Sequence, residues 1–199
     1  MALILEIFKK IKFSDSQIRK GKFRDLNFER RELFGKTLGV IGVGKVGSYV
    51  VRLAKAFGMK IIANDIDSKV RKTYKNLEFR SSVYLLKHSD IVSIHIPLND
   101  KNKNFISKSK FDLMKKNSVF INTSRGAVID EKYLIRLLKR KKIKFAGLDV
   151  FENEPDINRE LFKIENLIMT NHTAGKTAES RVKMSEDIFH QISNHYIFK

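Results

Sequence analysis

A set of three closely spaced glycines within residues 38–57 constrains the fold of this chain more than any other stretch. The glycines follow the apolar run Leu38–Ile41 and precede residues 45–57, which mix apolar and polar side chains as an amphipathic helix does. A short apolar run with β-branched residues is typical of a parallel-sheet strand covered on both faces. The stretch therefore predicts a buried strand, a tight turn and a helix, in that order.

The three glycines, Gly42, Gly44 and Gly47, have the spacing G-x-G-x-x-G. In a dinucleotide-binding turn the first glycine makes the turn, the second lets the backbone approach a pyrophosphate, and the third lets the helix pack on the strand. The free N–H groups and the positive dipole end of the helix favour phosphate binding. The motif predicts a bound dinucleotide; the alternative is an α/β domain that keeps the turn for structure alone.

The next apolar run, Lys60–Asn64, is a second predicted strand and ends at Asp65. A carboxylate at this place accepts hydrogen bonds from an adenosine ribose. It favours NAD over NADP, because a carboxylate repels the 2′-phosphate of NADP. Three nearby cations, Lys69, Arg71 and Lys72, keep NADP open as an alternative.

The composition permits one hydrophobic core and a small appendage, because 42% of the 199 residues are hydrophobic. No apolar run approaches the roughly 20 residues of a membrane span, so we expect no membrane insertion. The opening residues lack the basic region and cleavage site of a signal peptide. The chain has no cysteine, which excludes disulfides and thiolate metal sites. We therefore expect no metal and a cytoplasmic location.

The formal net charge of +18 makes nucleic acid a partner to consider. The basic residues are scattered, however, and no nucleic-acid module interrupts the α/β pattern. The densest run, residues 139–144, lies where a helix is expected to end and a strand to begin, and cations there complement the helix dipole. We therefore do not expect a nucleic-acid surface.

Apolar strands and helical segments alternate along the rest of the chain, which predicts a doubly wound parallel sheet, a Rossmann domain, with ligands at the carboxyl ends of the strands. Further strands are expected at residues 90–97, 119–122, 144–149 and 167–169, and helices at 2–12, 82–87, 109–114, 131–139 (capped by Asp130) and 177–196. Residues 66–76 are expected to be mainly a polar connector. The apolar face of the first helix is expected to need a partner outside the chain. We divide the chain into a linker helix and connector (1–30), the dinucleotide-binding domain (31–176) and a C-terminal helix (177–199).

Several motifs occur in a characteristic order. They are Gly42–Gly47, Asp65, Ser89–Leu98, Ile121–Glu131, Leu148–Pro155 and Asn171–Gly175. Together they closely resemble the D-isomer-specific 2-hydroxyacid dehydrogenases, the group that includes D-3-phosphoglycerate, glycerate and D-lactate dehydrogenases. The resemblance covers essentially the whole chain, and several motifs in order are more specific than any single one.

The resemblance implies three catalytic residues. Arg125 would hold the carboxylate and carbonyl oxygen of a 2-oxo acid, because its guanidinium donates two aligned bonds. His172 would give a proton to the carbonyl oxygen during reduction and take it back in the reverse direction. Glu154 would pair with His172, favouring the imidazolium and fixing the ring. Out of context each has a bland alternative, a solvated charge or a turn residue, yet all three follow predicted strands at the edge where α/β sites form.

The resemblance also implies an NAD site. Asp149 would bind the nicotinamide carboxamide. The full set of cofactor-binding residues expected is Gly42, Gly44, Lys45, Val46, Gly47, Asp65, Pro97, Thr123, Ser124, Arg125, Asp149, His172 and Gly175. His95 is expected to be structural.

The chain departs from the family in extent. Full-length relatives have a substrate lobe built mainly from a segment before the linker helix, and Met1 falls inside that helix. Lys141 stands at a helix end where relatives often have glycine, so a left-handed conformation there would strain it.

Two functions from different classes follow. The first is an NAD-dependent oxidoreductase acting on a small D-2-hydroxy or 2-oxo acid, either as a fragment of a longer enzyme or completed by a separate chain. The expected partner is a second copy in a homodimer or a chain that supplies the substrate lobe. The second is a non-catalytic NAD-binding regulatory module, like the corepressor branch that resembles this family. A formate-dehydrogenase-like alternative is disfavoured, because that branch typically lacks the glutamate found at position 154. Self-association is expected through the apolar face of residues 3–11.

Overall fold

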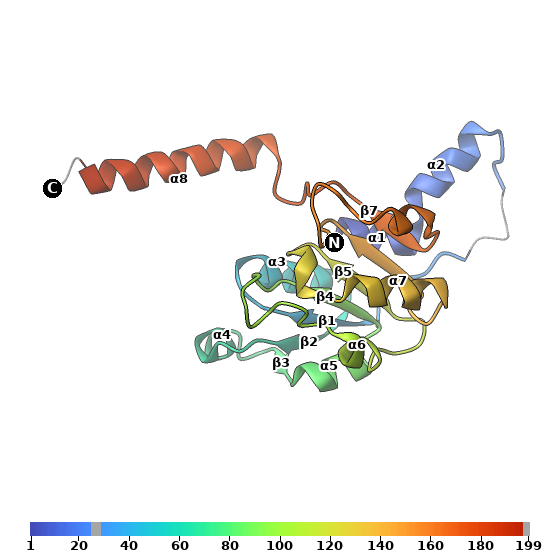
Figure 1. Ribbon diagram of the computed structural model, residues 1–199, viewed down its shortest axis with the longest axis horizontal. Coiled ribbons are helices and arrows are strands. Elements are labelled where there is room, and N and C mark those ends of the chain that lie inside the picture. Colours follow the sequence, from blue (N-terminus) through green and yellow to red (C-terminus); the bar gives the residue numbers. More distant parts are fainter. Residues whose placement is uncertain (25–28, 197–199) are drawn as a thin grey trace.

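The computed structural model describes residues 1–24 and 29–196 and is built around one sheet (Figure 1). Within the described residues the sheet has seven strands, all parallel, in the order β3-β2-β1-β4-β5-β6-β7. The strands are β1 (Thr37–Ile41), β2 (Lys60–Asn64), β3 (Glu78–Phe79), β4 (Ile91–Ile94), β5 (Val119–Asn122), β6 (Phe145–Leu148) and β7 (Leu167–Met169). This is a Rossmann-like domain, so the predicted doubly wound parallel sheet is confirmed.

The strand order reverses between β1 and β4. The chain runs from β1 outward to β2 and β3, then returns to place β4 on the other side of β1. Ile41 at the end of β1 lies in register with Asn64 of β2 and with Ile94 of β4. The carboxyl ends of the central strands therefore meet at one edge of the sheet, where open α/β folds bind their ligands.

Helices cover both faces of the sheet. One face carries α1 (Ala2–Lys9) and α3 (Lys45–Ala56), and the other carries α5 (Ser82–His88), α6 (Lys108–Phe111) and α7 (Glu131–Lys139). Strands β1, β4 and β5 are buried almost throughout, as parallel strands covered on both sides must be. The predicted cap of α7 is confirmed, since the Asp130 side chain accepts a hydrogen bond from the Tyr133 N–H.

The first helix differs from its expectation. Its apolar residues Ile4, Ile7 and Phe8 are buried, against this chain's own sheet rather than an outside partner. The reason is that α3 covers β1 and β2 on this face, which leaves β6 to be covered by α1. The helix ends early because Lys10 takes a left-handed conformation, with φ 54°, and a separate helix α2 (Ile11–Arg19) follows.

The connector after Asp65 also contains more structure than expected. Residues Ser68–Thr73 form helix α4, and Glu78–Phe79 add strand β3 at the edge of the sheet. The side chain of Asp67 accepts a hydrogen bond from the Lys69 N–H and caps α4. An aspartate before a short polar segment is a typical helix start, and it is the signal that could have found this helix.

Two helices stand away from the sheet. Figure 1 shows α2 and α8 (Ala178–Tyr196) projecting from the body of the domain. Large apolar side chains are exposed on both, including Ile11 on α2 and Phe189 on α8. In the described part of the chain, no helix combines the length and apolar character that crossing a membrane requires. The division of the chain at residues 30 and 176 stays a prediction.

Candidate active site

The glycine turn after β1 has the geometry that a pyrophosphate needs. Gly42 adopts φ 87°, and a Cβ there would lie 2.6 Å from the backbone oxygen of His95. A Cβ at Gly47 would overlap the backbone oxygen of Gly42, so this glycine allows α3 to pack on the turn. A Cβ at Gly44 would meet no atom within 4 Å, which leaves the backbone open to a ligand. Among the described residues no side chain accepts a hydrogen bond from the first turn of α3, so its free N–H groups suit a phosphate.

Asp65 ties the end of β2 to the glycine turn. Its Oδ2 accepts a hydrogen bond of 2.7 Å from the Val43 N–H, and its Oδ1 accepts one of 2.9 Å from the Asp67 N–H. Each carboxylate oxygen can accept more than one bond, and the residue is half-exposed. The carboxylate is therefore held in a fixed orientation and still able to accept from ribose hydroxyls.

A buried asparagine shapes the turn that carries Arg125. The Asn122 Oδ1 accepts hydrogen bonds from the Ser124 N–H (3.0 Å) and hydroxyl (2.9 Å), and its Nδ2 donates to the Arg125 backbone oxygen at 2.9 Å. The Arg125 Nη1 donates to the Ser124 oxygen at 2.6 Å. The sequence analysis gave Asn122 no role, although its position at the end of a strand inside a quoted motif was a usable signal.

His172 and Glu154 form the pair that the sequence predicts. The His172 Nδ1 lies 2.7 Å from Glu154 Oε2, and Glu154 Oε1 accepts a 2.9 Å hydrogen bond from the Phe151 N–H. Burial raises the pKa of the Glu154 carboxyl, but the hydrogen bonds from His172 and Phe151 outweigh it, so this pKa lies below its usual value. An ionised Glu154 accepts from Nδ1–H, which leaves Nε2 for proton exchange.

The loop that presents His172 is held by Asp149, which is 2% exposed. One carboxylate oxygen accepts hydrogen bonds from the Thr170 hydroxyl and the Thr173 N–H, and the other accepts from the Ala174 N–H. Burial raises the pKa of Asp149, but these bonds outweigh burial and the pKa is lowered. His172 itself has φ 56°, so Asp149 anchors the loop on both sides of a strained residue.

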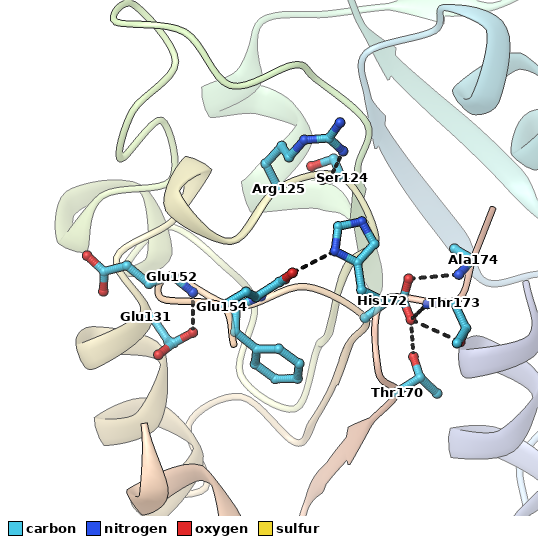
Figure 2. A network of polar contacts seen from close by, with 11 residues as sticks. Ser124, Arg125, Glu131, Glu152, Glu154, Thr170, His172, Thr173 and Ala174 are labelled. Atoms are coloured by element: carbon cyan, nitrogen blue, oxygen red, sulfur yellow. Dashed lines mark hydrogen bonds and ion pairs between the residues drawn. The ribbon is translucent and has the colours of Figure 1, made fainter. Parts of the chain in front are cut away.

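The two halves of the site touch at Gly126. A Cβ at this glycine would overlap the backbone of Phe151, so no other residue lets the Arg125 turn lie against the Glu154 loop. Beside it, the buried Glu131 accepts a 3.0 Å hydrogen bond from the Glu152 N–H. Figure 2 shows Glu154 and Arg125 on different sides of the His172 imidazole. Neither Gly126 nor Glu131 was predicted from the sequence to have a role in the site.

The structure brings the predicted residues to one edge of the sheet. The predicted residues Lys45 and Val46 follow β1, Pro97 follows β4 and Gly175 follows β7, and all four are exposed. Thr123 and Ser124 follow β5 and are half-buried. A cavity of about 650 Å³ opens beside His172 and Glu154, with the apolar residues Phe151, Ile157, Phe162 and Met169 in its lining. The edge thus combines a phosphate turn, a cation, a paired imidazole and an apolar hollow.

His95 also lies at this edge. Its Nε2 is 2.9 Å from the Ser93 hydroxyl, and burial together with the nearby amino terminus lowers its pKa to about 4. The imidazole is therefore neutral at physiological pH. His95 is half-buried, and its backbone oxygen borders Gly42, as a residue with a structural role would.

Residues 1–174 match the family described as D-isomer specific 2-hydroxyacid dehydrogenase, NAD binding domain. The chain belongs to this family. The match also confirms the cofactor predicted from the glycine turn, NAD, at the level of the domain. Known proteins that resemble the chain agree with this assignment.

Among curated relatives, the glyoxylate reductase of Thermococcus litoralis is 40% identical over 93% of this chain and 58% of its own. The D-3-phosphoglycerate dehydrogenase of Methanocaldococcus jannaschii is 38% identical over 96% of this chain and 37% of its own. The crystal structure of D-lactate dehydrogenase from Aquifex aeolicus, complexed with NAD and lactic acid, superimposes with a TM-score of 0.85 at 32% identity, over 98% of this chain and 63% of that one. The chain therefore spans less than two thirds of these relatives.

Proposed function

We propose that this chain is the cofactor-binding and proton-transferring part of an NAD-dependent oxidoreductase that interconverts a D-2-hydroxy acid and a 2-oxo acid. The observation that carries the proposal is the 2.7 Å contact between His172 Nδ1 and Glu154 Oε2, at the same sheet edge as Arg125 and the glycine turn. A paired imidazole beside an exposed guanidinium supplies a proton and a carboxylate-binding group together.

The residues present fit NAD. The N–H groups at the start of α3, with the open backbone at Gly44, would hold the pyrophosphate, and Asp65 would accept from the adenosine ribose. Thr123, Ser124 and the loop after β7 would line the nicotinamide side. When bound, NAD supplies or accepts the hydride.

His172 is the group that exchanges the proton with the substrate. In the direction of reduction, Nε2–H donates to the carbonyl oxygen of the oxo acid, and in the direction of oxidation Nε2 takes the proton from the hydroxyl. Glu154 holds the ring through Nδ1 and stabilises the positive charge of the doubly protonated form. Arg125 binds the substrate carboxylate with two parallel N–H groups and orients the carbonyl toward the imidazole.

The first test is cofactor binding. Titration of the chain with NADH by calorimetry should show one site, weakened by Asp65→Ala, and weaker binding of NADPH. The second test is turnover with glyoxylate, hydroxypyruvate, pyruvate and longer 2-oxo acids, compared with His172→Ala. Turnover equal to that of the His172→Ala variant on every substrate, also with candidate partner chains added, contradicts the proposal.

The assembly is part of the same proposal. Because α1 covers this chain's own sheet, we place the contact with a second copy or a partner chain on the projecting helices α2 and α8, where Ile11 is 62% exposed and Phe189 68% exposed. Exposed apolar groups of this kind favour association. Light scattering at micromolar concentration should give a mass above that of one chain, and a single-chain mass contradicts it. The cytoplasmic location stays a prediction from the sequence.

A further inference from the structure

A second cavity, of about 370 Å³, lies at the opposite edge of the sheet from His172. Its lining includes residues that directly precede strands: Lys36 before β1, Asp90 before β4, Ser118 before β5 and Lys144 before β6. Because the strands are parallel, these positions mark the amino ends, whereas Arg125 and His172 follow carboxyl ends. The cavity is therefore separate from the proposed active site.

Six basic side chains and two carboxylates contribute to the lining of this cavity. Both carboxylates are already paired. Glu29 contacts Arg31 at 3.0 Å and Lys144 at 3.5 Å, and Asp90 contacts Lys115 at 3.0 Å. The cavity therefore keeps an excess of positive charge after its internal ion pairs have formed.

Two further cations on the lining, Lys36 and Lys116, form no ion pair with any residue in the described part of the chain. Lys10 also lines the cavity, where burial and then repulsion by Lys144 lower its pKa while Glu29 and Glu6 act in the opposite direction. Crowded ammonium groups repel one another and are stabilised by a bound anion.

An unsatisfied hydroxyl lies in the same lining. Ser118 is 2% exposed, and its Oγ has no hydrogen-bond partner among the described residues. A buried polar group without a partner is uncommon and costs free energy. The Oγ is inaccessible in this rotamer, so a ligand with several acceptor oxygens would use it, as well as the lysines, after a change of the Ser118 rotamer.

We propose that this cavity binds a multivalent phosphate, such as a diphosphate or a phosphate ester. A phosphate group carries up to two negative charges and offers tetrahedrally arranged acceptors, so it can contact several ammonium groups and a hydroxyl at once. A monocarboxylate neutralises only one of the unpaired cations. The ligand class thus follows from the charge excess, the unpaired Lys36 and Lys116, and the unsatisfied Ser118.

The test is calorimetric titration of the purified chain with inorganic pyrophosphate at about 0.1 M salt, where exposed charges are screened beyond roughly 10 Å. We expect saturable binding at one site, weakened about tenfold by Lys36→Ala combined with Lys116→Ala, and weakened less by Ser118→Ala. The matched control is Lys55→Ala combined with Lys75→Ala, which removes the same charge from another basic surface and should leave binding unchanged.

Other outcomes overturn the proposal. Equal weakening in both double variants, or binding that never saturates, shows attraction to the overall charge or an adventitious ion only. Binding that survives Lys36→Ala/Lys116→Ala but is displaced by NADH places the pyrophosphate at the glycine turn. Binding of a DNA duplex that depends on Lys36 and Lys116, with no binding of pyrophosphate, assigns the cavity to nucleic acid.

Discussion

The two edges of this one sheet handle charge in opposite ways. At the carboxyl edge, the buried carboxylates of Asp149 and Glu131 accept hydrogen bonds largely from backbone N–H groups. At the amino edge, Glu29 pairs with the side chains of Arg31 and Lys144, and the partly exposed Asp90 accepts one hydrogen bond from the Thr37 N–H and one from Lys115. Backbone donors fix a carboxylate in place, whereas flexible cations only concentrate charge. In this fold, the orientation of the carboxylates near the proposed active site is therefore set mainly by main-chain donors.

The largest difference between the edges should appear in activity. Replacing His172 by Gln removes the group that exchanges the proton and should lower kcat about 10²- to 10⁴-fold in the oxo-acid assay at saturating NADH. The control at the amino edge, Lys116→Ala, should leave kcat unchanged because the residue lies away from the reacting atoms. A His172→Gln variant with undiminished kcat would remove the proton-transfer role.

The next effect concerns stability and uses one aspartate from each edge. Asp149→Ala leaves backbone donors of the His172 loop without acceptors in a buried place and should lower the free energy of unfolding by about 3 kcal/mol. Asp90→Ala removes one backbone partner, the Thr37 N–H, and one ion pair with Lys115, and should cost about 1 kcal/mol because water can reach both donors at this partly exposed place. Urea denaturation measures both. Equal losses would show that backbone anchoring adds nothing at the carboxyl edge.

The free energy of unfolding should also depend on pH through His95, at the carboxyl edge. The folded chain holds His95 with a pKa of about 4, whereas an unfolded histidine titrates near 6.5. Below pH 6.5 the unfolded state therefore takes up a proton that the folded state refuses, and stability falls as the pH drops toward 4. Between pH 7 and pH 5 the loss should be about 2 kcal/mol.

The matched variant for this effect is His95→Gln, which keeps a polar side chain beside Ser93 but does not titrate. Denaturant unfolding at pH 7, 6 and 5 should show a flatter profile for His95→Gln than for the parent chain. Parallel profiles would mean that the imidazole is not the group that responds. The carboxylates at this edge, Asp149 and Glu154, have lowered pKa values and lose their contribution only at more acidic pH.

Much of this architecture could be predicted from local sequence. Apolar runs placed β5 and β7 at their observed bounds, and the glycine spacing placed the turn after β1. The resemblance to the family implied the pairing of Glu154 with His172, and their contact agrees with the general rule that parallel strands bring their carboxyl ends together. These features depend on a few neighbouring residues, so the sequence carries them directly.

The remainder depends on contacts between distant residues. The apolar stripe of α1 was visible in the sequence, but its covering by β6, more than 130 residues away along the chain, was not. The roles of Gly126 and Glu131 depend on the Phe151–Glu152 backbone, which only the fold brings close. The role of Asn122 depends on the direction of its side chain, which the sequence does not determine. Nothing in the sequence around Ser118 predicts that its hydroxyl is buried without a hydrogen-bond partner among the described residues.

The smallest effect returns to the amino edge. Two residues after the end of helix α7, Lys141 adopts the left-handed φ of 52° that the sequence predicts for this position. The N–H groups of Lys141 and Lys142 donate to the backbone oxygens of Leu138 and Leu137. This hydrogen-bond pattern favours glycine at the left-handed residue. Lys141→Gly should therefore raise the free energy of unfolding by about 0.5–1 kcal/mol, the relief of strain being partly offset by the entropy of glycine in the unfolded chain. Urea denaturation of Lys141→Gly and of Lys141→Ala separates two causes, because alanine removes the charge of Lys141 but keeps a Cβ. An equal increase of the free energy of unfolding in both variants would show that repulsion between cations, and not backbone strain, destabilises this position.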